Sequence, residues 1–128
     1  MNRPSPEKAR EVRSFLLPAA RSGRTVTYGD LMKRHNLSRG RALSRMIGTV
    51  DRAEIKKRAP GFAAIIVRKD TGFPGGGFFC DDDLPRGLVR DRRKSSDPRL
   101  TAAERDYVRV QQKRIWSFYG SKRRATQP

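Results

Sequence analysis

Residues 27–52 read TYGDLMKRHNLSRGRALSRMIGTVDR, and their apolar positions have the spacing of two helices joined by a turn. Thr27 is suited to cap a short helix that begins near Tyr28, and residues 35–37 are expected to form the turn. Ser38 is then expected to cap a longer helix. A short helix, a tight turn and a longer amphipathic helix are typical of a helix-turn-helix.

The longer helix is expected to have two contrasting faces when its residues are placed at 100° each. Its core face contains Leu43, Met46, Ile47 and Val50. The opposite face contains Arg41, Arg45 and Arg52, with Gly48 among them. An arginine face that enters a groove of nucleic acid and an ordinary solvated helix face both fit this pattern.

A first helix is expected to precede this unit. Ser5 followed by Pro6 is a helix-start signal, because serine caps free amides and proline suits the first helical position. We expect Pro18 to end or kink this helix and Gly23 to close the segment.

A hairpin is expected after the longer helix. Residues 62–67 read FAAIIV, which is typical of a buried strand, and residues 68–72 turn the chain. Residues 73–79 return it, and the basic tip carries Arg68 and Lys69. Such a hairpin is typical of the wing of a winged helix, although its three consecutive glycines fit a flexible turn nearly as well.

The fold class predicted from these elements is α+β, a winged helix-turn-helix with a short β-hairpin wing and an additional C-terminal helix. Residues 1–80 form the DNA-binding domain and residues 81–99 a basic linker or arm. Thr101 and Glu104 form a capping box for the last helix, over residues 100–120, which packs on the domain. Residues 121–128 are expected to be a disordered basic tail.

The charge balance predicts a polyanionic partner. Among 128 residues, 30 are Lys or Arg and 13 are Asp or Glu, which gives a net charge of +17. Nucleic acid is favoured, although electrostatics alone does not exclude an anionic membrane or an acidic protein. No apolar segment has the length of a membrane span, so no membrane partner is predicted. The single cysteine, Cys80, excludes an internal disulfide and favours a reducing cytoplasm. Association with the nucleoid is predicted, in keeping with a DNA partner.

The predicted function is non-catalytic binding of double-stranded DNA, and RNA or ribosome binding is the alternative. A metal-dependent nuclease is less favoured, because consecutive carboxylates at Asp81, Asp82 and Asp83 point alternately on an extended chain. No cofactor, no metal and no catalytic residue are predicted, and the oligomeric state is left open. The expected DNA-binding residues are Thr27, Tyr28, Ser38, Arg39, Arg41, Ser44, Arg45, Arg52, Arg68 and Lys69.

Three segments resemble one family, the alkylguanine-DNA alkyltransferases and the alkyltransferase-like proteins. Residues 25–31, TVTYGDL, look like the family's VTTYGDLA segment. Residues 41–47, RALSRMI, are similar to its RAVGxAL helix, and residues 66–72, IVRKDTG, to its VVxxDG strand and turn. The resemblance covers roughly residues 8–79. It implies a winged helix-turn-helix that enters the DNA minor groove, with Tyr28 and Arg41 at positions that help to expel a base.

The chain departs from this family at the reactive motif. The family's PCHRV falls on residues 62–66, so that Ala63 stands at the position of the reactive cysteine. The alkyltransferase-like branch has tryptophan there, and the alanine puts lesion recognition in doubt as well. Cys80 has no neighbouring histidine to generate a thiolate and is expected to be a partly buried free thiol. The resemblance therefore implies the scaffold and its contact with DNA, without alkyl transfer.

Overall fold

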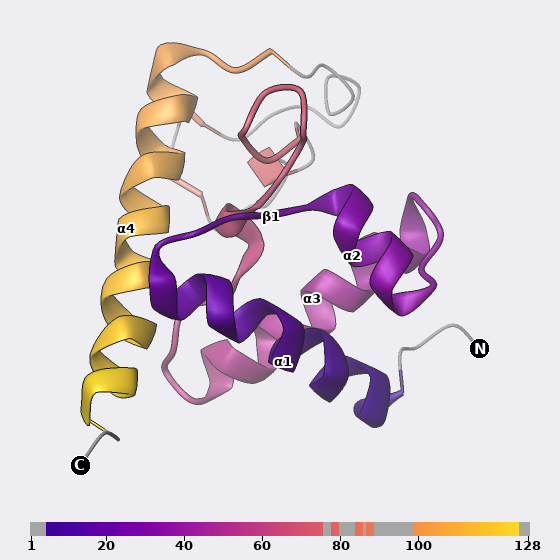
Figure 1. Cartoon of the computed structure of the whole chain (residues 1–128). Helices are drawn as coiled ribbons and strands as arrows, with labels where there is room; N and C mark the ends of the chain where they lie inside the picture. The colour runs from indigo at the N-terminus through magenta and orange to yellow at the C-terminus, as the bar shows by residue number, and fades with distance from the viewer. Residues whose placement is uncertain (1–4, 76–77, 80–83, 86, 89–98, 126–128) are drawn as a thin grey trace.

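The computed structural model describes residues 5–75, 78–79, 84–85, 87–88 and 99–125, the last five of these as helical backbone only. These residues form a helix-rich α+β arrangement. In chain order the elements are α1 (Pro6–Ser22), β1 (Val26–Thr27), α2 (Tyr28–His35), α3 (Arg41–Lys56), the 3-10 helix η1 (Ala63–Ile65), β2 (Ile66–Val67) and α4 (Ala102–Ala125). In Figure 1, α4 runs along the left side of the molecule, and α2 lies toward the right side, above the N-terminal part of α1.

The boundaries of α1 follow from its sequence, except at Pro18. The side chain of Ser5 accepts a hydrogen bond from the amide of Lys8, and Gly23 closes the helix with a φ of 71°, as expected. Pro18 does not end α1, which continues to Ser22. Ser14 and Pro18 are both exposed, so water can reach the Ser14 carbonyl that lacks an amide partner.

The predicted helix, turn and second helix are present, but α3 begins later than expected. Thr27 caps α2 by accepting a hydrogen bond from the Asp30 amide at 3.1 Å, as predicted. Ser38 does not cap α3, because the N-cap position is Gly40, whose φ of 90° suits glycine. The chain turns at Gly40, and α3 cannot start before that turn.

The expected β-hairpin is not formed by the described residues. β2 pairs in parallel with β1, with Val26 opposite Ile66 and Thr27 opposite Val67. Within the expected strand 62–67, Ala63–Ile65 is a 3-10 helix. The reason is that the Asp51 carboxylate accepts hydrogen bonds from the amides of residues 62 and 63, which are then unavailable to a β-ladder. Gly76 and Gly77 of the expected return strand lie outside the described residues.

The last helix begins with the predicted capping box. The Thr101 amide donates to Glu104 Oε1 at 2.8 Å, and the Glu104 amide donates to Thr101 Oγ1 at 3.1 Å. α4 then packs against α1 and η1 and continues to Ala125, into the segment expected to be a tail. α4 and α1 approach closely at Gly120, where an added Cβ would lie 3.6 Å from the Arg21 carbonyl oxygen.

One hydrophobic core joins all four helices and the short sheet. Fully buried side chains from α1, α2 and α3 meet residues of the η1–β2 segment and of α4 there; among the largest are Leu16, Leu31, Met46, Phe62 and Ile65. The four helices are thereby fixed relative to one another, which positions the exposed faces discussed below. None of the helices in the described part of the chain is long and apolar enough to cross a bilayer.

Candidate nucleic-acid interface

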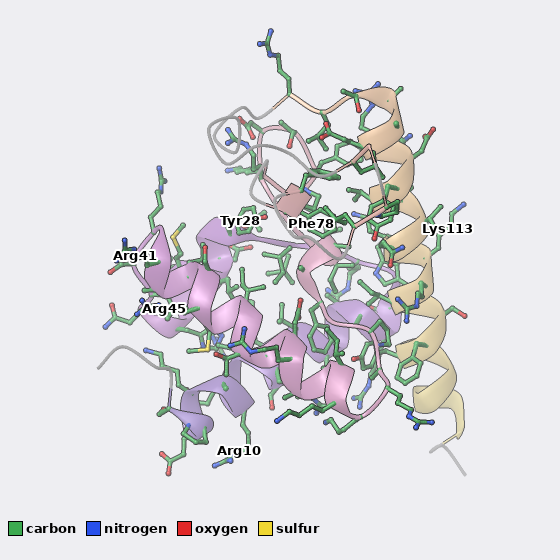
Figure 2. The ribbon with its side chains drawn as sticks, turned by 180° about the vertical axis from the view of Figure 1, so that it is seen from behind. Arg10, Tyr28, Arg41, Arg45, Phe78 and Lys113 are labelled. Atoms are coloured by element: carbon green, nitrogen blue, oxygen red, sulfur yellow. The ribbon has the colours of Figure 1, made fainter. Side chains whose placement is uncertain are left out.

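The outward side of α3 presents four exposed cations, Arg41, Arg45, Arg52 and Lys56, which we call the α3 face. Their spacing of 4, 7 and 4 residues places them on one side of the helix. The opposite side is buried, with exposed fractions of 8% for Leu43, 2% for Met46 and 2% for Val50. The two faces predicted for this helix are therefore confirmed, and Figure 2 shows Arg41 and Arg45 projecting away from the rest of the protein.

Both acidic residues of α3 are turned away from the α3 face. Asp51 Oδ1 lies 2.6 Å from the Phe62 amide, and its Oδ2 lies 3.3 Å from the Ala63 amide. Burial raises the pKa of Asp51 to about 6, although the two amide hydrogen bonds act in the opposite direction. Asp51 also closes over Gly61, where an added Cβ would overlap its carboxyl group. This carboxylate fixes the chain after Pro60 against α3.

Glu54 is buried, with 1% of its area exposed, and is surrounded by hydrogen-bond donors. Arg13 of α1 contacts both carboxylate oxygens, at 2.8 and 3.2 Å, and Lys57 Nζ lies 3.2 Å away. Tyr119 Oη lies 2.9 Å from Glu54 and 2.7 Å from the Pro60 carbonyl oxygen. Burial opposes the charge, but the hydrogen bonds from Arg13, Tyr119 and Lys57 outweigh it and lower the pKa of Glu54. α1, α3 and α4 therefore meet at one ionised carboxylate.

An open cleft of about 1180 Å³ lies beside the α3 face, between α3, α4 and the chain that follows Pro60. Five of the ten predicted binding residues line it: Tyr28, Arg39, Ser44, Arg68 and Lys69. The other five lie outside its lining: Thr27, Ser38, Arg41, Arg45 and Arg52. Figure 2 shows Tyr28 and Phe78, which both line the cleft, in the space between α3 and α4.

The first predicted binding residues in the chain have structural contacts. The Thr27 hydroxyl is occupied by the cap of α2, and the Gly75 amide donates to Tyr28 Oη at 3.1 Å. Burial raises the pKa of Tyr28, although the Gly75 amide and Arg68 act against this. Tyr28 thus ties α2 to the later loop, whereas Ser38 is exposed between α2 and α3.

Arg68 and Lys69 lie in a hydrogen-bonded turn, where Arg68 is ion-paired and Lys69 is exposed. The turn is held by hydrogen bonds from the Arg68 amide to the Phe73 carbonyl and from the Gly72 amide to the Arg68 carbonyl, both 2.9 Å. The Arg68 guanidinium forms a two-point ion pair with Asp70, at 2.7 and 2.9 Å. Lys69 is exposed, and it is therefore the better placed of the two to contact a phosphate.

Two cations at this site were not predicted, Lys56 at the end of the α3 face and Arg114 in the cleft wall. Lys56 follows Arg52 by four residues, and Arg114 follows Gln111, which also lines the cleft, by three. This helical spacing was the signal that the sequence offered. Within the described ranges, no group of three His, Cys, Asp or Glu side chains is placed to hold a metal ion. Asp81, Asp82, Asp83 and Cys80 lie outside the described residues.

The comparisons with known proteins add no relative: no family model, no curated protein and no solved structure matches the chain.

Proposed function

We propose that this protein binds double-stranded DNA through the α3 face and does not act on it as a catalyst. The observation that carries the proposal is the separation of charge on α3. Its outward side has four cations, while both of its acids are engaged by the fold, Asp51 with backbone amides and Glu54 with Arg13 and Lys57. An ordinary solvated helix mixes charges of both signs on its outer side, and this helix does not.

In this proposal α2 and α3 act as a helix-turn-helix, with α3 as the recognition helix. Small side chains at Ala42, Ser44 and Ala53, all exposed, allow the helix to approach the duplex closely. The turn that carries Lys69 takes the role of a wing and contacts the phosphate backbone. The net charge of +17 supports a polyanionic partner over a neutral one.

The experiment is a salt titration of binding, followed by fluorescence anisotropy of a labelled DNA duplex. Each phosphate contact contributes about 0.9 to the slope of log affinity against log salt, so the four α3 cations and Lys69 together give a slope of roughly 4 to 5. The double variant Arg41→Ala/Arg45→Ala is expected to lower this slope by about 2. It should remain folded, because both side chains are exposed and lie outside the hydrophobic core.

The matched control is Arg10→Ala, which removes an exposed cation of α1 outside the α3 face. It should keep the wild-type slope. A slope near zero for the wild type, or an unchanged slope for the double variant, would contradict the proposal. Competition by an unlabelled RNA duplex of equal length tests the alternative of RNA binding. If RNA displaces the labelled DNA more effectively than unlabelled DNA does, the α3 face is an RNA-binding surface.

A further inference from the structure

A second row of cations lies on α4. Arg109, Lys113, Trp116 and Gly120 recur at intervals of 4, 3 and 4 residues, which places them along one side of the helix. Arg109 and Lys113 are exposed, and the only exposed acid of α4 is Asp106, since Glu104 is buried. Asp106 lies 3.5 Å from Arg109, and both side chains are more than half exposed, so this pair offsets little of the charge.

The last turn of α1 and the loop that follows it extend this row with two further arginines, Arg21 and Arg24. Trp116 Nε1 donates a hydrogen bond to the Arg24 carbonyl oxygen at 3.0 Å, and the Arg21 carbonyl lies beside Gly120. Both arginine side chains are exposed. We call Arg21, Arg24, Arg109 and Lys113 the α4 face. From residue 109 to residue 120 the helix rises roughly 16 Å, a length that spans several phosphates of a DNA strand.

The α4 face and the α3 face point in different directions. In Figure 2, Arg41 and Arg45 project from one side of the molecule and Lys113 from the other, and Figure 1 places α4 on the side opposite the α2–α3 turn. A compact chain of this length is roughly 35 Å across. DNA has a persistence length of about 500 Å, so one duplex held on the α3 face does not bend around to reach the α4 face.

We propose that the α4 face binds a second DNA duplex, so that a single chain bridges two duplex segments. The occupant is inferred from charge complementarity, because four exposed cations against one weakly paired acid match a phosphate backbone. This inference rests on the proposed function for the first contact, at the α3 face. It extends that function from occupancy of one duplex to the joining of two.

The experiment captures one duplex with another. Beads carry a biotinylated duplex, a fluorescent duplex is free in solution, and the captured fluorescence reports bridging by added protein. The variant Arg24→Glu/Lys113→Glu should reduce capture about five-fold or more, because it reverses two of the four charges that hold the second duplex. Its affinity for a single duplex, measured by anisotropy, should stay within about two-fold of wild type, since the α3 face is intact.

The matched control is Lys8→Glu/Arg10→Glu, which makes the same change in net charge on the N-terminal half of α1 and should keep the capture. Equal loss in the control, or full capture by the α4 variant, would overturn the inference. Binding of a single duplex without any capture by the wild type would overturn the bridging role alone, whereas absence of all duplex binding would overturn the proposed function too. Sedimentation of the free protein should give the monomer mass of 14.6 kDa, and a dimer would overturn bridging by a single chain.

Discussion

Replacing Glu54 by glutamine tests whether the buried carboxylate stabilises the junction of α1, α3 and α4. Arg13 donates to both oxygens of Glu54, from Nε and from Nη2. In either orientation, the amide group of glutamine must therefore place its NH2 against an arginine N–H. One hydrogen bond is lost, a contact between two donors replaces it, and the charge that attracts Arg13 and Lys57 is gone.

The expected size of the loss follows from burial. Removing one partner of a buried ion pair costs about 3–5 kcal/mol when the remaining charge stays buried. Here the side chains of Arg13 and Lys57 are 36% and 59% exposed, so both cations can reach water. This reduces the expected loss of unfolding free energy to about 2 kcal/mol, because the rehydrated charges are no longer stranded. For a chain of this length the melting temperature should fall by about 6–8 °C.

Thermal unfolding followed by far-UV circular dichroism measures the effect, with Glu11→Gln as the matched control at an exposed position. The control should change the unfolding free energy by less than about 0.5 kcal/mol. Since the folded-state pKa of Glu54 lies below its ordinary value of 4.5, its stabilising effect is present above pH 4.5 and is lost as pH falls through the folded-state pKa. The difference in unfolding free energy between wild type and Glu54→Gln should therefore become smaller at low pH. Equal melting temperatures at neutral pH, or a difference that persists in acid, would refute the reasoning.

Two glycine substitutions should differ in their effect on thermal stability, and one cysteine substitution tests for alkyl transfer. Gly61→Ala should cost about 1–3 kcal/mol, because its Cβ overlaps the Asp51 carboxyl group, whereas Gly29→Ala should be neutral or stabilise α2 by up to about 1 kcal/mol. The reverse order of melting temperatures would contradict the placement of Asp51. Incubation with DNA that contains a labelled alkylguanine should leave no label on wild type or on Cys80→Ser, and label on wild type alone would show an activated thiolate at Cys80.

Local signals predicted the presence of the four helices, several of their ends and the two sides of α3. Ser5, Gly23 and the pair Thr101 and Glu104 act within a few residues of the helix ends that they define, so the sequence alone predicts them. Ser38 was a false signal, because a serine also fits a loop, and the positive φ of Gly40 determines where α3 begins.

Contacts between distant segments could not be read from local patterns. Residues 62–67 have the composition of a strand, but periodicity does not indicate which segment pairs with them. The partner of β2 is β1, which lies about 40 residues earlier in the chain. The burial of Glu54 likewise depends on Arg13 and Tyr119, which are 41 and 65 residues away. Sequence patterns placed three of the four cations of the α3 face correctly and missed Lys56, whereas the contacts of the two α3 acids required the tertiary structure.

The positions of these acids connect the stability of the fold to its surface charge. Asp51 accepts hydrogen bonds from the segment after Pro60, and Glu54 from side chains of α1 and α4. Both acids therefore stabilise the fold, and neither contact involves a ligand. As a consequence, every charged residue on the outward side of α3, from Arg41 to Lys56, is a cation. Over these residues the helix rises about 22 Å, which matches roughly six nucleotide steps of 3.4 Å along one DNA strand. A continuous positive face of this length is therefore a by-product of how α3 is anchored. In the proposed function, this anchoring presents the face to a duplex already formed, which lowers the cost of binding.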